Sequence, residues 1–289
     1  MILAALAWPV EPTPSIGAYA DKLDRWIGEA AGAELLLMPE YACVELGAAL
    51  AGQSVATEAE ELRAMVAHAP ELLAVMRDAA RRHQVWLQPG TLPMTRGNAV
   101  VNRAPLIRPD GTLAFQDKSK MTRFESERWG VSAGHPPAVF DTDWGRIGIA
   151  ICYDAEFPKL IRAQVEAGAW CVLVPTCTDS LHGYNRVRFS AQARAVENQV
   201  YLAVAPTVGL APHSTALDEN HGAASIHGPV DRGFPADGVI VQGGLDQPGW
   251  VRARLDRAAI ARVREEGAVR NHRDWPTAPI PTPQPAGFA

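Results

Sequence analysis

Over residues 2–87, short apolar runs alternate with longer segments in which apolar side chains recur every three or four positions. A short, wholly apolar run predicts a buried strand, whereas the wider spacing predicts a helix with one apolar side. Ser15 has the side chain of an N-cap and precedes such a helix. The predicted elements are, in order, a strand at 2–8, a helix at 16–30, a strand at 35–37, helices at 58–68 and 71–83, and a strand at 85–87. This β-α-β-α-β order is typical of α/β folds.

The remainder of the chain adds many short strands. Arg108-Pro109-Asp110-Gly111 is a turn-forming group between two extended runs, 98–107 and 112–117, and predicts a hairpin. Further strands are expected at 147–151, 171–174, 201–208, 224–226, 239–242 and 250–255, with helices after Pro158, at 186–198 and at 257–265. Because no linker or repeat interrupts residues 1–274, we predict one domain of two sheets packed in a sandwich and covered by helices. Residues 275–289 are rich in proline and are expected as a tail, either loose or laid across a neighbour.

The apolar run 147–151 delivers a cysteine, Cys152, at the point where the strand ends. Asp154, Glu156 and Pro158 follow it in the order that begins a helix. A thiol at a strand-to-helix junction lies among unpaired backbone N–H groups, which favour the thiolate and can bind an oxyanion. The alternative is a buried cysteine of the core. The local context leaves both interpretations open.

Glu40 and Lys118 also lie within a residue or two of predicted strand ends, where sites collect in α/β folds. If the strands are neighbours, the two side chains converge with Cys152. A glutamate beside a thiol can take its proton as a general base, and a lysine ammonium can stabilise both a thiolate and an oxyanion. Considered singly, Glu40 and Lys118 are equally typical of ordinary surface charges.

Composition excludes several classes of protein. The chain has 289 residues, 47% of them apolar and 20% charged, with a net charge of -5 and no run of lysine or arginine, so a nucleic-acid partner is not expected. No apolar run approaches the roughly 20 residues of a membrane span, and the apolar start lacks the basic residue of a signal peptide. Four cysteines without a C-x-x-C pair indicate a reduced, cytoplasmic protein. The histidines form no H-x-x-x-H pair and no phosphate-binding glycine loop is present, so neither a metal nor another cofactor is expected.

Several separate segments, in order, resemble the nitrilase superfamily of carbon-nitrogen hydrolases, whose defining triad is Glu-Lys-Cys. The segments are Pro39-Glu40, Asp117-Lys118, residues 151–154 with 156–158, residues 194–199 with Tyr201, and residues 222–229. The resemblance covers nearly the whole chain, and so many ordered matches make it specific. It implies a four-layer α-β-β-α sandwich, usually assembled as a homodimer or a larger homo-oligomer. It also implies that Cys152 is the nucleophile, Glu40 the general base and Lys118 the stabiliser of the tetrahedral intermediate, with the Tyr153 N–H as the other oxyanion donor.

Members of this superfamily often carry a second glutamate between the lysine and the cysteine. Glu125 and Glu127 both qualify, and the distance along the chain to Gly134 favours Glu127 as a catalytic residue. The residues expected to line the substrate pocket are Tyr41, Arg123, Phe124, Tyr153, Glu156, Thr176 and Cys177. Among these, Arg123 can receive a substrate carboxylate and Glu156 a substrate amine, although both are also compatible with structural roles.

Two features bear on the substrate. Asp117 beside the lysine, and Lys120 where many members have histidine, depart from the superfamily pattern and change the pocket wall. Tyr153 stands where true nitrilases more often have tryptophan, which favours an amide. The resemblance therefore implies a cofactor-independent hydrolase that converts a small amide to an acid and ammonia through a cysteine thioester. An N-carbamoyl amidase or a nitrilase with the same triad, a thiol hydrolase that uses histidine, and a non-catalytic binding module remain alternatives.

Overall fold

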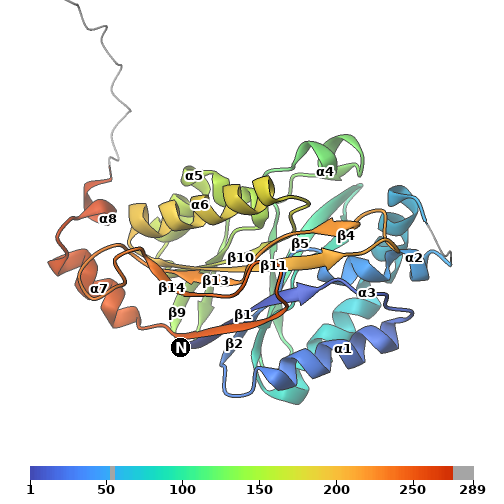
Figure 1. Cartoon of the computed structure of the whole chain (residues 1–289), viewed down its shortest axis with the longest axis horizontal. Coiled ribbons are helices and arrows are strands. Elements are labelled where there is room, and N and C mark those ends of the chain that lie inside the picture. The colour runs from blue at the N-terminus through green and yellow to red at the C-terminus, as the bar shows by residue number, and fades with distance from the viewer. Residues whose placement is uncertain (53–55, 276–289) are drawn as a thin grey trace, which may run out of the picture.

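The computed structural model describes residues 1–52 and 56–275, so the predicted tail lies, from residue 276 onward, outside the described residues. Two sheets pack face to face between two layers of helices (Figure 1). Helices α1 (Ile16–Glu29) and α3 (Glu58–His83) cover one sheet, and α5 (Pro158–Glu166) and α6 (Leu181–Asn198) cover the other. The predicted α-β-β-α sandwich is confirmed. No helix in the described ranges is both long and apolar enough to cross a membrane.

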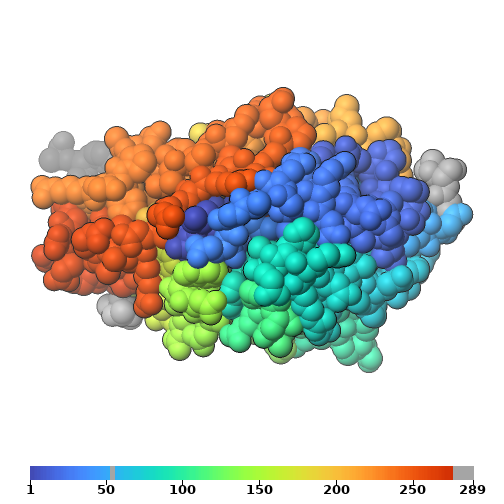
Figure 2. Space-filling view, turned by 90° about the horizontal axis from the view of Figure 1, so that it is seen from below, coloured from blue at the N-terminus to red at the C-terminus, as the bar shows by residue number. Residues whose placement is uncertain are grey.

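The first sheet contains the N-terminal strands and one strand from the C-terminal part of the chain. Its order is β15 (Gly249–Arg254), β1 (Ile2–Pro9), β2 (Leu35–Leu37), β3 (Trp86–Gln88), β5 (Ala99–Ile107) and β4 (Leu92–Arg96), with β6 (Leu113–Asp117) and β7 (Val131–Ser132) also paired to β5. Figure 2 views this side of the molecule, with α1 in blue and α3 in teal over the sheet.

The second sheet follows in chain order. It contains β8 (Val139–Thr142), β9 (Gly145–Ile149), β10 (Cys171–Thr176), β11 (Tyr201–Leu210), β13 (Ser225–His227) and β14 (Val239–Gln242), with β12 (Glu219–Asn220) on the end of β11. At one end of β1, Trp8 and Pro9 pair with Thr207 and Val208 of β11, and this short seam joins the two sheets. The short helices are α2 (Gly47–Leu50), α4 (Arg123–Glu127), α7 (Arg257–Glu266) and α8 (Asn271–Asp274), with 3-10 helices η1 (Ala42–Leu46) and η2 (Cys152–Glu156).

Strand β1 shows why the apolar runs form buried strands. Its side chains alternate between two faces, as in any strand. Leu3, Ala5 and Ala7 pack between the sheets, while Ala4, Leu6 and Trp8 pack in the cluster beneath α1 and α3. A strand with helices on one face and a second sheet on the other must be apolar throughout, which accounts for the run at 2–8.

Most predicted strands are confirmed within a residue or two, but the helices at 58–68 and 71–83 are one helix, α3, which passes through Pro70. An internal proline costs roughly 3 kcal/mol because it removes a backbone donor and crowds the preceding turn. Met65, Leu72 and Met76 are buried along the same face on both sides of Pro70, and their burial offsets that cost. Helix α6 begins at Leu181 rather than Arg186, because the Ser180 side chain caps it by accepting a hydrogen bond from Gly183 N.

Candidate active site

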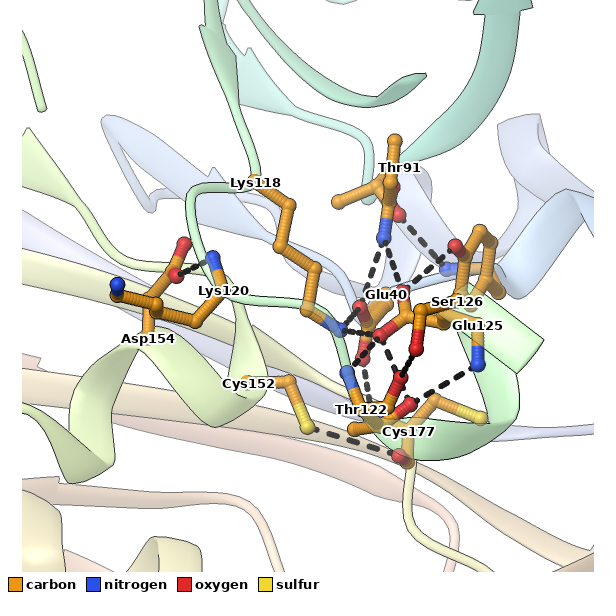
Figure 3. Close-up of polar contacts among 12 residues, drawn as sticks. Glu40, Thr91, Lys118, Lys120, Thr122, Glu125, Ser126, Cys152, Asp154 and Cys177 are labelled. Carbon is orange, nitrogen blue, oxygen red and sulfur yellow. Dashed lines mark hydrogen bonds and ion pairs between the residues drawn. The ribbon is translucent and has the colours of Figure 1, made fainter. Parts of the chain in front are cut away.

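Three loops at the ends of β2, β6 and β9 bring Glu40, Lys118 and Cys152 together (Figure 3). All three line one pocket of about 310 Å³. Each of the three residues is at least 95% buried, with exposed fractions of 1%, 1% and 5%. The structure therefore brings together the residues that the strand ends indicated, and neither Glu40 nor Lys118 is a surface charge.

The Lys118 ammonium lies between two buried carboxylates. Its Nζ donates to Glu40 Oε1 at 2.8 Å and to Glu125 Oε2 at 2.6 Å. The Tyr41 hydroxyl donates to Glu125 Oε1 at 2.9 Å, and the backbone N–H of Cys177 donates to Glu40 Oε2 at 3.1 Å. A buried ammonium with two ionic partners is fixed in one place, which suits a group that must stabilise charge at a defined point.

Asn102 is a member of this cluster that the sequence analysis missed. It lies on β5, is fully buried, and its Nδ2 donates to Glu40 Oε1 at 2.8 Å and to Glu125 Oε1 at 3.4 Å. Its backbone carbonyl also accepts from Lys118 N. Asn102 thus links the two carboxylates and holds the start of the lysine loop. The available signal was an amide side chain within a strand predicted to be buried.

Cys152 begins η2 and has a φ of 47°, a left-handed conformation that a residue other than glycine seldom adopts. Such a conformation costs on the order of 1–3 kcal/mol and persists only where the surroundings enforce it. It turns the chain so that the side chain enters the pocket. The Thr176 hydroxyl donates to Cys152 Sγ at 3.2 Å, and the thiol contacts the Cys177 carbonyl oxygen at 3.6 Å.

The lysine loop is fixed from both sides. The Asp154 carboxylate, on the nucleophile loop, accepts backbone hydrogen bonds from Ser119 and Lys120, at 2.8 Å in the shortest case (Figure 3). Asp117 is buried and pairs with Arg96 and Arg103, so the acid that departs from the superfamily pattern is a structural anchor rather than part of the pocket wall.

Burial and neighbouring charge set the protonation of the site. Burial raises the pKa of Glu40 to about 7; the Lys118 ammonium opposes this and the Glu125 charge adds to it. Burial, with the charge of Glu40, raises the pKa of Cys152 well above its usual value. The resting sulfur is therefore a thiol. The expectation that backbone N–H groups favour a resting thiolate is wrong, because desolvation and the adjacent carboxylate outweigh them.

Glu127, the favoured second glutamate, does not reach the site. It lies on the outer side of α4, where its carboxylate pairs with Arg123 Nε at 2.9 Å and its side chain is 57% exposed. Glu125 occupies the position beside Lys118 instead. Residues two apart on a helix point in nearly opposite directions, so only one of them can face the pocket.

The other expected pocket residues are divided in their placement. Tyr41, Phe124, Tyr153, Glu156 and Cys177 line the pocket. Thr176 contributes through its hydrogen bond to the Cys152 sulfur. The guanidinium of Arg123 turns outward and its side chain is 88% exposed, and Glu156 pairs with Arg186 at 3.5 Å. Neither group is free for the substrate contact considered from the sequence.

The two glutamates of α4 offer a matched test. We expect Glu125→Gln to reduce kcat/KM by about 10²-fold, because Lys118 loses one of its two buried carboxylate partners. Glu127→Gln should stay within about threefold, because only an exposed ion pair is lost. Steady-state kinetics of both variants would check this, and an equal loss in the two would contradict the placement of Glu125 at the site.

Comparison with known proteins identifies relatives along nearly the whole chain. A family model described as carbon-nitrogen hydrolase matches residues 4–264. The "Probable hydrolase YhcX" of Bacillus subtilis is 31% identical over 94% of this chain and 53% of its own, so this chain spans about half the length of that relative. A deaminated glutathione amidase of Synechocystis is 29% identical over 84% of this chain and 86% of its own.

Solved structures match as well. An amidase from a Nesterenkonia species has a TM-score of 0.66 and 26% identity, over 91% of this chain and 95% of the other. Nit3 of Saccharomyces cerevisiae, a member of the nitrilase superfamily, has a TM-score of 0.72 at 20% identity, over 95% of this chain and 96% of the other, which shows the fold alone.

The four-layer sandwich, with a buried thiol, an ammonium and two carboxylates at the ends of its strands, defines an enzyme that hydrolyses carbon–nitrogen bonds. The chain belongs to the carbon-nitrogen hydrolase family, within the nitrilase superfamily.

Proposed function

We propose that this protein hydrolyses a small amide to a carboxylic acid and ammonia through a thioester on Cys152. The observation that carries the proposal is the shared pocket, where a thiol, an ammonium and two carboxylates converge and little else in the wall is reactive. The relatives named as amidases support it. In another structure of the Nesterenkonia amidase, acrylamide has added to the active-site cysteine of that enzyme.

The first half of the reaction forms the thioester. Glu40 takes the Cys152 proton as the sulfur attacks the amide carbon, and the carbonyl oxygen becomes an oxyanion. Lys118 and the Tyr153 N–H stabilise that oxyanion. Glu40 then returns the proton to the nitrogen, the C–N bond breaks, and ammonia leaves. In the second half, water gives a proton to Glu40 and attacks the thioester, the acid leaves, and the proton restores the thiol.

A proton that passes from Cys152 to Glu40 leaves the total charge of the cluster unchanged. This matters because the pKa of the thiol is raised by burial, so loss of its proton to solvent would create an additional buried anion. With a pKa of about 7, Glu40 is matched to accept a proton and to return it near neutral pH. Glu125 raises the pKa of Lys118 and so keeps the ammonium charged.

Ammonia release from a panel of simple amides, N-carbamoyl amino acids and nitriles tests the proposal. We expect release from amides, and none from a Cys152→Ala control. Release confined to carbamoyl compounds or to nitriles would favour those alternatives, which use the same residues. If no compound reacts, labelling by iodoacetamide decides whether Cys152 is a reactive thiol. Labelling no faster than that of the buried Cys43 and Cys171 would favour a non-catalytic binding module.

The pKa of Glu40 predicts the acidic limb of the pH profile. A general base must be ionised in the free enzyme, so kcat/KM is expected to fall as the pH drops through about 7. The measurement is kcat/KM for one amide from pH 5 to pH 9. A profile that stays flat down to about pH 5, near the usual glutamate pKa, would contradict the assignment of Glu40 as the base.

A further inference from the structure

The charges around the active-site pocket favour one end of the substrate over another. Beyond Glu40, Glu125 and Lys118, the pocket is lined by four carboxylates, Glu156, Asp179, Asp218 and Glu219, and by two guanidinium groups, Arg123 and Arg186. This wall is therefore negative in net charge. An excess of one sign in a cleft attracts ligands of the opposite sign.

Both guanidinium groups already have carboxylate partners. Arg123 makes two hydrogen bonds with Glu127, from Nε at 2.9 Å and from Nη2 at 3.2 Å. Arg186 pairs with Glu156 at 3.5 Å. A substrate carboxylate would have to displace one of these partners to reach a guanidinium. The wall thus provides no free cation for an anionic substrate.

Three carboxylates remain. Asp179 follows β10, whereas Asp218 and Glu219 lie at the end of the loop between β11 and β12, so two separate parts of the chain supply them. Within the described ranges none of the three pairs with a lysine or arginine; Glu219 contacts only His221, at 2.9 Å. Asp218 accepts from the N–H of Glu219, and Asp179 accepts from the Ser180 hydroxyl.

The loop that carries Asp218 and Glu219 is itself held in place. The fully buried Glu61 of α3 accepts hydrogen bonds from Ser214 Oγ at 2.7 Å and from Thr215 N at 2.8 Å. Ala216, two residues before Asp218, lines the same pocket. The acidic side of the pocket is therefore anchored to the helical layer over the first sheet.

We propose that the substrate is an amide that carries a positive charge, an ammonium or guanidinium group, at the end remote from the scissile bond. This inference rests on the proposed amidase function and specifies its substrate class. The amide group lies against Cys152 and Lys118, and the cation lies toward Asp179, Asp218 and Glu219. The pocket volume of about 310 Å³ fits a small molecule of this kind.

Three amides of matched length test the charge preference. They are 5-aminopentanamide, its uncharged counterpart hexanamide, and 5-carbamoylpentanoate, which bears a carboxylate. We expect kcat/KM to be about tenfold higher for the ammonium compound than for hexanamide, and lowest for the carboxylate. The preference should decrease between about 0.05 and 0.5 M salt, since salt screens exposed charges. An equal or higher kcat/KM for the carboxylate would overturn the proposal and leave the amidase function intact.

Variants locate the preference. Asp218→Asn combined with Glu219→Gln should lower the ratio of kcat/KM for 5-aminopentanamide over hexanamide by about fivefold. Asp21→Asn, an exposed acid on α1, should leave the ratio unchanged. An unchanged ratio in the double variant would contradict the role of these carboxylates.

Binding of the three compounds to Cys152→Ala, measured by calorimetry, tests charge preference without turnover. Tighter binding of the ammonium compound would support the proposal even if no ammonia is released, a result that would count against the amidase function alone. Binding without regard to charge would overturn the proposal.

Discussion

Replacing Cys152 with alanine is expected to lower amide turnover by about 10⁴-fold or more while leaving a folded protein. The variant has no atom that can form the thioester. The thiol makes only two weak contacts, with the Thr176 hydroxyl and the Cys177 carbonyl, so the ion cluster of Glu40, Lys118 and Glu125 keeps its own hydrogen bonds. Ammonia release and thermal unfolding of the purified variant would measure the two effects.

Cys171 supplies the matched control. It is a buried thiol at the start of β10, away from the pocket, and Cys171→Ala removes the same atom from the core. We expect a similar cost of about 1 kcal/mol in both variants. Turnover of Cys171→Ala should stay within about twofold of the unmodified enzyme. Turnover retained by Cys152→Ala would show that the nucleophile is another group.

Lys118→Met is expected to have the second-largest effect, on both activity and stability. Turnover should fall by about 10³-fold, because the oxyanion loses its fixed positive charge. The substitution also leaves Glu40 and Glu125 buried without their common cation. Breaking a buried ion pair in this way typically costs about 3–5 kcal/mol of the free energy of unfolding.

That cost should depend on pH in a defined direction. Without Lys118, burial and mutual repulsion raise the pKa values of both carboxyl groups in the folded state further above those of the unfolded chain; the pKa of Glu40 is already about 7 with the lysine present. The folded state then binds more protons than the unfolded state, so stability decreases as the pH rises. Denaturant unfolding of Lys118→Met should show a smaller deficit at pH 5.5 than at pH 8.

Lys22→Met is the control for this substitution. Lys22 is also buried and pairs with the buried Glu45, but it lies on α1 and lines no part of the active-site pocket. It should be destabilised with activity within about fivefold of the unmodified enzyme. Comparable loss of turnover in both lysine variants would indicate that Lys118 acts only through stability.

The sequence predicted those parts of the fold and site that depend on local pattern. Strand β1 and the residues after the strand ends were predictable because apolar runs mark buried strands and sites collect where such strands stop. The single helix through Pro70 was not, because the apolar face that offsets the proline becomes apparent only when α3 lies on the sheet. The homodimer and the cytoplasmic location stay predictions.

The second glutamate shows where spacing fails and local chemistry succeeds. Glu125 and Glu127 are equally close to Lys118 along the chain, for practical purposes, and the distance to Gly134 pointed to the wrong one. Thr122 with Glu125 has the T-x-x-E pattern of a capping box, and both of its hydrogen bonds are present. That pattern places Glu125 in the first turn, where its carboxylate also reaches Lys118. Asn102 required the pairing of strands to be known.

The pairing of β1 with β15 has a consequence for synthesis on the ribosome. Strand β1 emerges first, yet one of its two edges is covered along Ile2–Ala7 only by residues 249–254. The first sheet is therefore incomplete until almost the entire chain has been made, and the nascent chain carries an open, apolar strand edge throughout. Contacts between such distant segments also slow folding. Recombinant production should thus benefit from slower translation or added chaperone more than from changes to the active site.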